Sequence, residues 1–275
     1  MHNFNRENLL SMIYGSILII TLELIFLKLT PQIYPIINTI PLLFLSQIIS
    51  LNLLFFSLII SFVFFLFSFF TNFLGNVISL KILLNFFTIS TIVFFFTILL
   101  NKNKNEKISN EKIIVYLTIF SLFTSALIYY FFFSEVEQNQ LREYLMKFIN
   151  EFLKIQKLSD EIDSTPLIET IIFVIPSINV FSFLITFLIN FNITRFLVKK
   201  LNFMNKYNFN ILVFEIPIMI FFLFNLLFIL SAQTSGNLHY IFLNCTIALS
   251  FLIFFEGFIS FFKLFKNFEL NNQLK

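Results

Sequence analysis

Seven long apolar runs separated by short polar gaps constrain this chain more than any other feature of its sequence. A helix needs about 20 mostly apolar residues to cross a hydrocarbon core about 30 Å thick. Each run is about that long or longer. The runs cover residues 9–27, 51–70, 77–100, 113–133, 167–198, 211–230 and 241–265. The pattern predicts a polytopic membrane protein built from helices.

An eighth apolar stretch, YPIINTIPLLFLSQIIS, precedes the run at 51–70 and is interrupted by Pro35 and Pro41. A single helix over 34–71 would be about 57 Å long, too long for one crossing. We therefore predict a break near 50–52 and an all-α bundle of about eight transmembrane segments. We expect a single integral membrane domain over residues 1–275. In the overlong run at 167–198, Pro176 predicts a kink or the end of an interfacial lead-in.

Composition excludes several classes of protein. The chain is 58% hydrophobic and 12% charged, whereas soluble domains are about 45–50% apolar and about 25% charged. A lone cysteine, Cys245, excludes a disulfide within the chain, and two histidines are too few for a metal cluster. No phosphate-binding glycine loop or basic patch with exposed aromatics occurs. We predict no enzyme, no catalytic residue, no metal or cofactor, and no nucleic-acid partner.

Charges in the polar gaps predict the topology. The loop at 101–112 has four lysines and two glutamates, the loop at 199–210 has three lysines and no acid, and the tail after 262 has three lysines and one glutamate. Short basic loops stay in the cytoplasm. These segments are separated by two crossings each, so all three can face one side. We predict a multi-pass protein of a bacterial inner (cytoplasmic) membrane with both termini in the cytoplasm.

The polar gap after the run at 113–133 is more than a loop. In LREYLMKFINEFLKIQKLSDEID, apolar residues recur at spacings of three and four, at Leu141, Leu145, Phe148, Phe152 and Ile155. This spacing predicts an amphipathic helix, within an insertion at about 135–165 on the outer side. Such a helix lies in the headgroup layer or caps the bundle. A surface helix that shields loops is the alternative.

Polar residues inside the spans are the functional candidates, because ionisable groups there are costly. Arg195, Glu215 and Glu256 map to the cytoplasmic half, with Lys263 two turns beyond Glu256. We interpret them as a structural ion cluster, with a coupling or gating site as the alternative. The outer half holds a second set that could orient a small solute or bond between helices. It comprises Glu23, Asn38, Lys81, Asn85, Asn179, Asn225 and Asn244.

Ser11 and Gly15 are four residues apart in the first run. This small-xxx-small spacing allows another helix to approach closely. It serves either packing within the bundle or contact with a partner protein.

Four stretches in this order resemble the YybS-like predicted membrane proteins, a family of unknown function (DUF2232). They are TIPLLFLSQI, IPSINVFSFLITFLINFNITRFLVKKL, FNILVFEIPIMI and FFEGFISFF, and the resemblance covers about 31–265. It implies recurrent positions at Pro41, Pro176, Asn190, Pro217 and Gly257, with Gln more usual at position 256. The family layout is similar to the substrate-binding subunits of energy-coupling-factor transporters, which implies a membrane partner protein.

Our leading hypothesis is an integral membrane protein that binds or translocates a small solute. The lipid bilayer is its surroundings, and any ATP dependence would come from a separate ATPase, since the chain has no nucleotide-binding loop. The alternative is a scaffold that does not transport and packs against partner membrane proteins.

Overall fold

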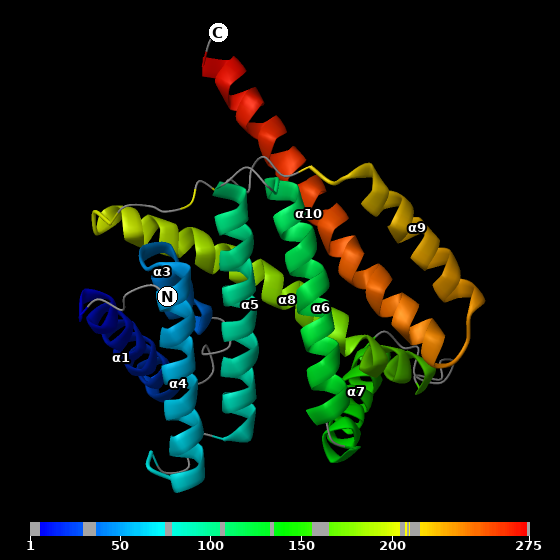
Figure 1. Cartoon of the computed structure of the whole chain (residues 1–275). Coiled ribbons are helices and arrows are strands. Elements are labelled where there is room, and N and C mark those ends of the chain that lie inside the picture. The colour runs from blue at the N-terminus through cyan, green and yellow to red at the C-terminus, as the bar shows by residue number, and fades with distance from the viewer. Residues whose placement is uncertain are drawn as a thin grey trace. The chain divides into compact units, whose positions relative to one another are not determined.

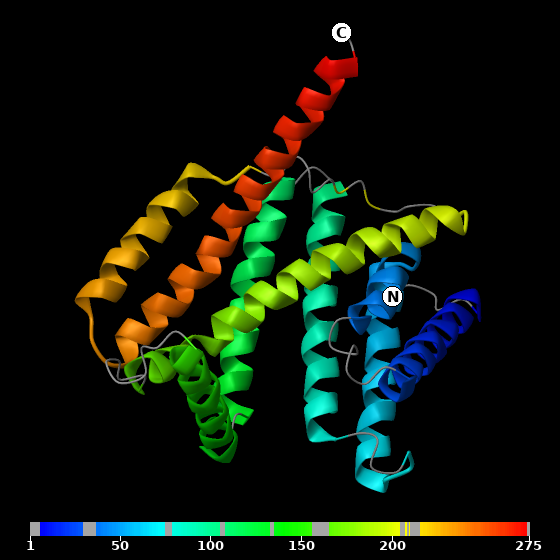
Figure 2. The same ribbon diagram turned by 180° about the vertical axis from the view of Figure 1, so that it is seen from behind.

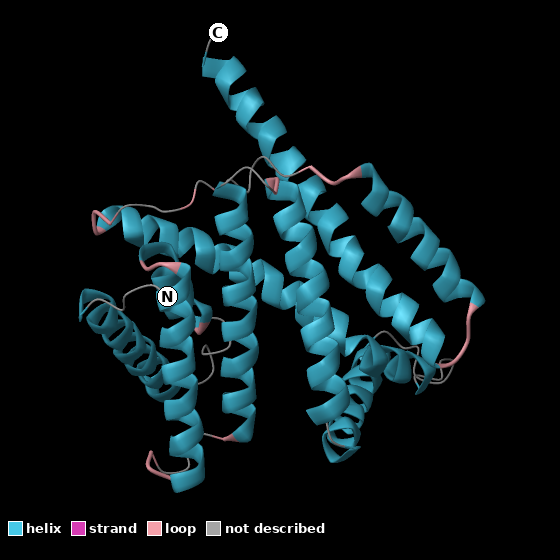
Figure 3. Cartoon of the chain, in the orientation of Figure 1, coloured by secondary structure: helices cyan, strands magenta, loops and turns pink. Residues whose placement is uncertain are grey.

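A computed structural model describes residues 6–29, 37–74, 79–104, 108–132, 135–155, 165–203, 207, 209 and 215–273. All regular structure in these residues is helical (Figure 3). The helices, coloured along the chain in Figure 1, are α1 (Arg6–Leu29), α3 (Thr39–Ile48), α4 (Leu51–Thr71), α5 (Leu80–Lys104), α6 (Asn110–Phe132), α7 (Glu135–Ile155), α8 (Thr165–Lys200), α9 (Ile218–Gln233) and α10 (Asn237–Gln273).

The expected helical membrane bundle is confirmed. Six helices are long and apolar enough to cross a membrane, namely α1, α4, α5, α6, α8 and α10. Two shorter apolar helices, α3 and α9, lie where the other two of the eight predicted segments are expected, and α7 is the predicted amphipathic helix. The predicted run limits at residues 77, 133 and 211, and residues 156–164 of the predicted insertion, lie outside the described part of the chain.

The chain forms two compact units. The first contains residues 1–117 and 183–211, and the second contains 118–182 and 212–275. Helices α6 and α8 each contribute to both units, so the expected single membrane domain stays a prediction.

The predicted break between the second and third segments is confirmed. The backbone is extended at Ile49 and Ser50, with ψ of 163° and 158°. The Ser50 side chain accepts a hydrogen bond from the backbone N–H of Leu53 at 3.4 Å and so caps α4. Side-chain oxygens at this position satisfy backbone donors that a helix start leaves open. The short helix α3 therefore ends inside the apolar region rather than continuing into α4.

Direct contacts define how the helices of the first unit pack. Ser57 and Ser61 of α4 donate to the backbone oxygens of Met12 and Ser16 of α1, at 3.1 and 3.5 Å. From the first pair to the second, the residue number increases in both helices, so α1 and α4 run in the same direction. The segment between them, which contains α3, must therefore return toward the starting side. The eight-segment topology itself stays a prediction.

Aromatic side chains fill much of the first unit. Phe65 of α4 packs on Phe86 of α5 with ring centres 4.8 Å apart, and the two helices lie side by side in Figures 1 and 2. Deeper in the unit, Phe96 of α5 is fully buried. Three rings meet it edge to face, from Phe187 and Phe191 of α8 and from Phe209 in the segment after α8. Edge-to-face geometry is the favoured arrangement for such pairs.

In the second unit, α9 and α10 form an antiparallel hairpin (Figure 2). Gly236 has a φ of +64° in the turn between them, a conformation that favours glycine. The expected start of the seventh segment at 211 is wrong for residues 215–217, which are not helical. Helix α9 begins directly after Pro217, because a proline disfavours helical conformation in the residue before it.

Candidate functional site

Helix α3 buries an unusual number of polar side chains for a short apolar helix. Asn38, directly before it, and Thr39, Ser46 and Gln47 within it are all at most 2% exposed. Two of these residues bond to α8. Asn190 donates through its amide nitrogen to the Thr39 hydroxyl at 2.7 Å, and Gln47 donates to the Thr194 hydroxyl at 2.8 Å. The two pairs tie α3 to α8 inside the first unit.

Part of this polar set is not used in hydrogen bonds. Within the described part of the chain, neither the amide nitrogen nor the amide oxygen of Asn38 forms one, although the residue is only 1% exposed. The Gln47 side-chain oxygen is in the same situation. A buried polar group without a partner costs about 1–3 kcal/mol, so such groups require an explanation. The α3 region therefore has free donor and acceptor capacity.

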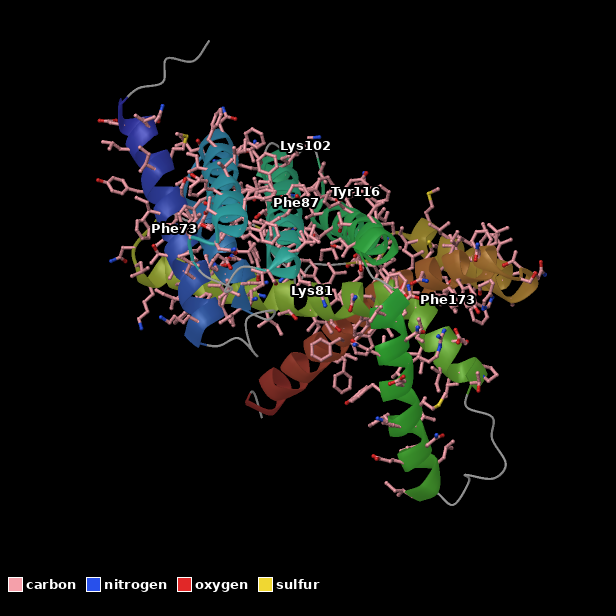
Figure 4. All side chains as sticks on the ribbon, turned by 90° about the horizontal axis from the view of Figure 1, so that it is seen from below. Phe73, Lys81, Phe87, Lys102, Tyr116 and Phe173 are labelled. Carbon is pink, nitrogen blue, oxygen red and sulfur yellow. The ribbon has the colours of Figure 1, made fainter. Side chains whose placement is uncertain are left out.

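The other predicted solute-facing residues of the first unit differ in burial. Glu23 of α1 is 1% exposed. Lys81, labelled in Figure 4, is exposed in the first turn of α5, and Asn85 is half-buried one turn further along. These three share the first unit with Asn38. Their joint role in solute binding stays a prediction.

The side-chain amide of Asn244 in α10 forms all its hydrogen bonds within the second unit. Its amide oxygen accepts from the backbone N–H and the hydroxyl of Ser177, at 3.2 and 2.6 Å. Its amide nitrogen donates to the backbone oxygens of Phe173 and Tyr240, at 2.8 and 2.9 Å. A side-chain amide has two donors and two acceptor positions. The predicted solute-facing amide is thus occupied by three bonds to α8 and one bond within α10.

The bonds of Asn244 belong to a larger arrangement around Pro176. Helix α8 continues through Pro176, so the predicted lead-in does not end there. A proline has no N–H and leaves the carbonyl four residues earlier unbonded within the helix. Here the Tyr129 hydroxyl of α6 donates to that carbonyl, at Ile172, with a distance of 3.1 Å. Ser125 of α6 donates to the oxygen of Pro176 itself at 3.1 Å.

The remaining two predicted amides of the second unit are exposed. Asn179 of α8 and Asn225 of α9 both lie on the surface. Asn225 donates to the backbone oxygen of Phe221 in its own helix at 2.8 Å. Identical side chains at similar expected depth thus occupy different environments in this protein.

The predicted cytoplasmic ion cluster is divided between the units. Arg195 of the first unit donates to the backbone oxygen of Phe209 at 2.6 Å and lies 6.0 Å from the ring centre of Phe191. It therefore holds Phe209 against the aromatic core. Glu215 is exposed before α9, and Glu256 is half-buried in α10, both in the second unit. The cluster of these three residues stays a prediction.

Of the predicted packing pair, Gly15 is buried and Ser11 is exposed. A Cβ atom added at Gly15 would lie 2.8 Å from the hydroxyl oxygen of Ser57 on α4. The absence of a side chain at Gly15 thus permits the serine contacts between α1 and α4. Gly15 serves packing within the protein.

Sequence reasoning missed several residues that carry the polar contacts. Gln47 and Thr194 were not candidates, and Asn190 entered only through the family resemblance. A signal was present, because Asn190 and Thr194 are four residues apart and therefore lie on one face of α8. The salt bridge between Arg142 of α7 and Glu169 of α8, at 2.9 Å, was also missed, since it depends on how α7 folds back onto α8.

Within the described residues, no group of three or more His, Cys, Asp or Glu side chains is placed to hold a metal ion. No protein-family model, curated protein or solved structure matches the chain. The resemblance to the YybS-like family therefore stays a prediction. The helices define the class as a multi-pass integral membrane protein.

Proposed function

We propose that this integral membrane protein binds a small polar solute beside α3 and moves it across the membrane. The observation that carries the proposal is the buried amide of Asn38, which forms no hydrogen bond to any described residue. A solute that supplies both a donor and an acceptor would satisfy this amide. The solute class that fits is a neutral amide or hydroxyl compound.

The broken helix supports the same location. Binding sites of secondary transporters are commonly formed by discontinuous helices near the membrane centre. Helix α3 has 10 residues, about 15 Å of length, and is separated from α4 by the extended residues Ile49 and Ser50. It packs against α1, α4 and α5 and bonds to α8. Movement of α3 relative to α8 would break the hydrogen bonds of Thr39 with Asn190 and of Gln47 with Thr194.

The charges of the loops favour a particular location and orientation of the protein. We place the protein in a bacterial inner membrane, with both termini in the cytoplasm, because the basic loops favour that side. A separate membrane partner or ATPase would supply any energy. Catalysis is not part of the proposed function.

The test is thermal unfolding of the purified protein with a panel of small polar compounds. A compound that binds the folded state at 100 times its Kd stabilises it by about 2.7 kcal/mol. We expect at least one compound to raise the Tm, and Asn38→Leu to abolish that rise. Asn225→Ala, which changes an exposed amide, is the matched control and should keep it. A panel without any shift, or an unchanged shift in Asn38→Leu, would refute the site.

A scaffold is the second candidate, and α9 favours it. Ser231 is the one residue of this apolar helix that is buried, and Asn225 presents an amide on its exposed surface. Polar side chains in membrane helices promote contact with other helices. Crosslinking from position 225 in native membranes tests the scaffold, because a scaffold should give a reproducible protein adduct, and the absence of any adduct would count against it.

A further inference from the structure

Helix α7 exposes an apolar face that its own unit does not cover. Tyr144, Phe148, Phe152 and Ile155 are 67%, 59%, 54% and 76% exposed, and their spacings of four, four and three place them on one side of the helix. We refer to these four residues as the α7 aromatic face. Leu153, on another side, is buried. The exposed face is therefore a separate surface rather than the packing surface of α7.

Contacts place α7 at one end of the membrane helices of the second unit. Arg142 of α7 forms its salt bridge with Glu169, near the start of α8. Both charges also act electrostatically on Tyr129, which lies in the last turn of α6. The middle of α7 is thus held at the level where α6 ends and α8 begins.

The direction of α7 fits this location. Figure 1 shows α7 foreshortened beside the Thr118–Phe132 part of α6, whereas Figure 4 shows α7 lengthwise and α6 nearly end on. Helix α7 therefore runs across the direction of the spanning helix to which it is joined. A helix with this orientation at the end of a span lies along the membrane surface.

We propose that the α7 aromatic face is buried in the boundary between lipid headgroups and acyl chains, and that lipid is its occupant. An interfacial helix buries its apolar side about 5–10 Å into this boundary. Helix α7 contains four glutamates against one arginine and two lysines, so it carries no excess of positive charge for anionic lipids. Apolar contact drives the insertion, which does not depend on lipid charge. This inference is independent of the proposed solute site.

The test uses the full-length protein in phosphatidylcholine vesicles, with Cys245→Ser as background. One variant carries Phe148→Cys on the α7 aromatic face, and the matched control carries Asn150→Cys on the opposite, exposed side. Each cysteine is spin-labelled, and collision with oxygen and with a water-soluble nickel complex is measured. We expect the label at 148 to lie about 5–10 Å below the lipid phosphates. The label at 150 should collide mainly with nickel.

Three outcomes would overturn the proposal. If the label at 148 collides with nickel as often as the label at 150, the face lies in water. If neither reagent reaches the label at 148, protein covers the face. If addition of anionic phosphatidylglycerol moves the label at 148 deeper, charge rather than apolar contact governs insertion. An unchanged depth after that addition supports the proposal.

Discussion

The contact between α1 and α4 predicts different effects for the same substitution at two glycines. Gly15→Ala places a Cβ atom 2.8 Å from the Ser57 hydroxyl oxygen, whereas Gly257→Ala meets no described atom within 4 Å. Contacts below 3.0 Å essentially never occur for real Cβ atoms. The Ser57 hydroxyl oxygen must move away by about 0.6 Å to reach an ordinary 3.4 Å contact. The other neighbours of the added Cβ atom are already at ordinary distances, so this oxygen is the atom that must move.

The size of the effect follows from what moves. If the Ser57 side chain rotates, its bond to the Met12 oxygen breaks, at a cost of about 0.5–1.5 kcal/mol. If α1 and α4 separate instead, the cost is that of overpacking, about 1–3 kcal/mol. The helix propensity gained from alanine, about 1 kcal/mol, is common to both glycines and cancels in the comparison. We expect Gly15→Ala to be less stable than Gly257→Ala by about 0.5–3 kcal/mol.

Equilibrium unfolding in mixed micelles with increasing dodecyl sulfate measures this difference. The chain has no Trp, so far-UV circular dichroism is the appropriate signal. Ser57→Ala removes the oxygen that clashes, and adding Gly15→Ala to it should cost no more than Gly257→Ala. Equal stability of the two single glycine variants would refute the packing argument, as would an undiminished penalty in the Ser57→Ala background.

Three further experiments test the polar contacts. Asn38→Leu should stabilise the protein without ligand by up to about 1–3 kcal/mol, because it removes a buried amide that no described residue satisfies. A loss of stability would show that the amide has a partner. Asn244→Ala should destabilise by about 2 kcal/mol, from four bonds at about 0.6 kcal/mol each, while Asn225→Ala changes unfolding by less than about 0.5 kcal/mol. A double-mutant cycle on Arg142 and Glu169, which are 37% and 34% exposed, should give a coupling of about 0.2–1 kcal/mol that salt weakens; a coupling insensitive to salt would contradict an exposed ion pair.

The sequence predicts the membrane segments well because their signal is local. The length of an apolar run in the sequence decides whether it can cross a membrane. The break between α3 and α4 is also local, because Ser50 caps α4 through its own side chain. The amphipathic spacing in α7 is local in the same way. The position of a residue along a helix, and hence its depth, follows from such counting.

The orientation of each helix about its own axis is harder to predict. The candidate site depends on this orientation, because it decides which side chains face the interior. Asn38, Asn179, Asn225 and Asn244 were indistinguishable in the sequence. Among the described residues, the first is buried and forms no hydrogen bond, the second and third are exposed, and the fourth uses all its donors and acceptor positions. Lipid and protein interior are both apolar, so a membrane helix has little sequence contrast between its faces. Contacts such as Gln47 with Thr194, 147 residues apart, have no local signal.

Because of the hydrogen bonds around Pro176, the effects of substitutions on three helices depend on one another. Asn244 and Tyr129 bind carbonyls in the turn of α8 that ends at the proline. Replacement of Pro176 by an ordinary residue would restore the N–H that serves Ile172 and make the Tyr129 hydroxyl redundant. Loss of the proline would therefore remove the need for a donor at position 129 that serves this carbonyl. We expect natural variants of this chain to exchange Pro176 and Tyr129 together rather than singly.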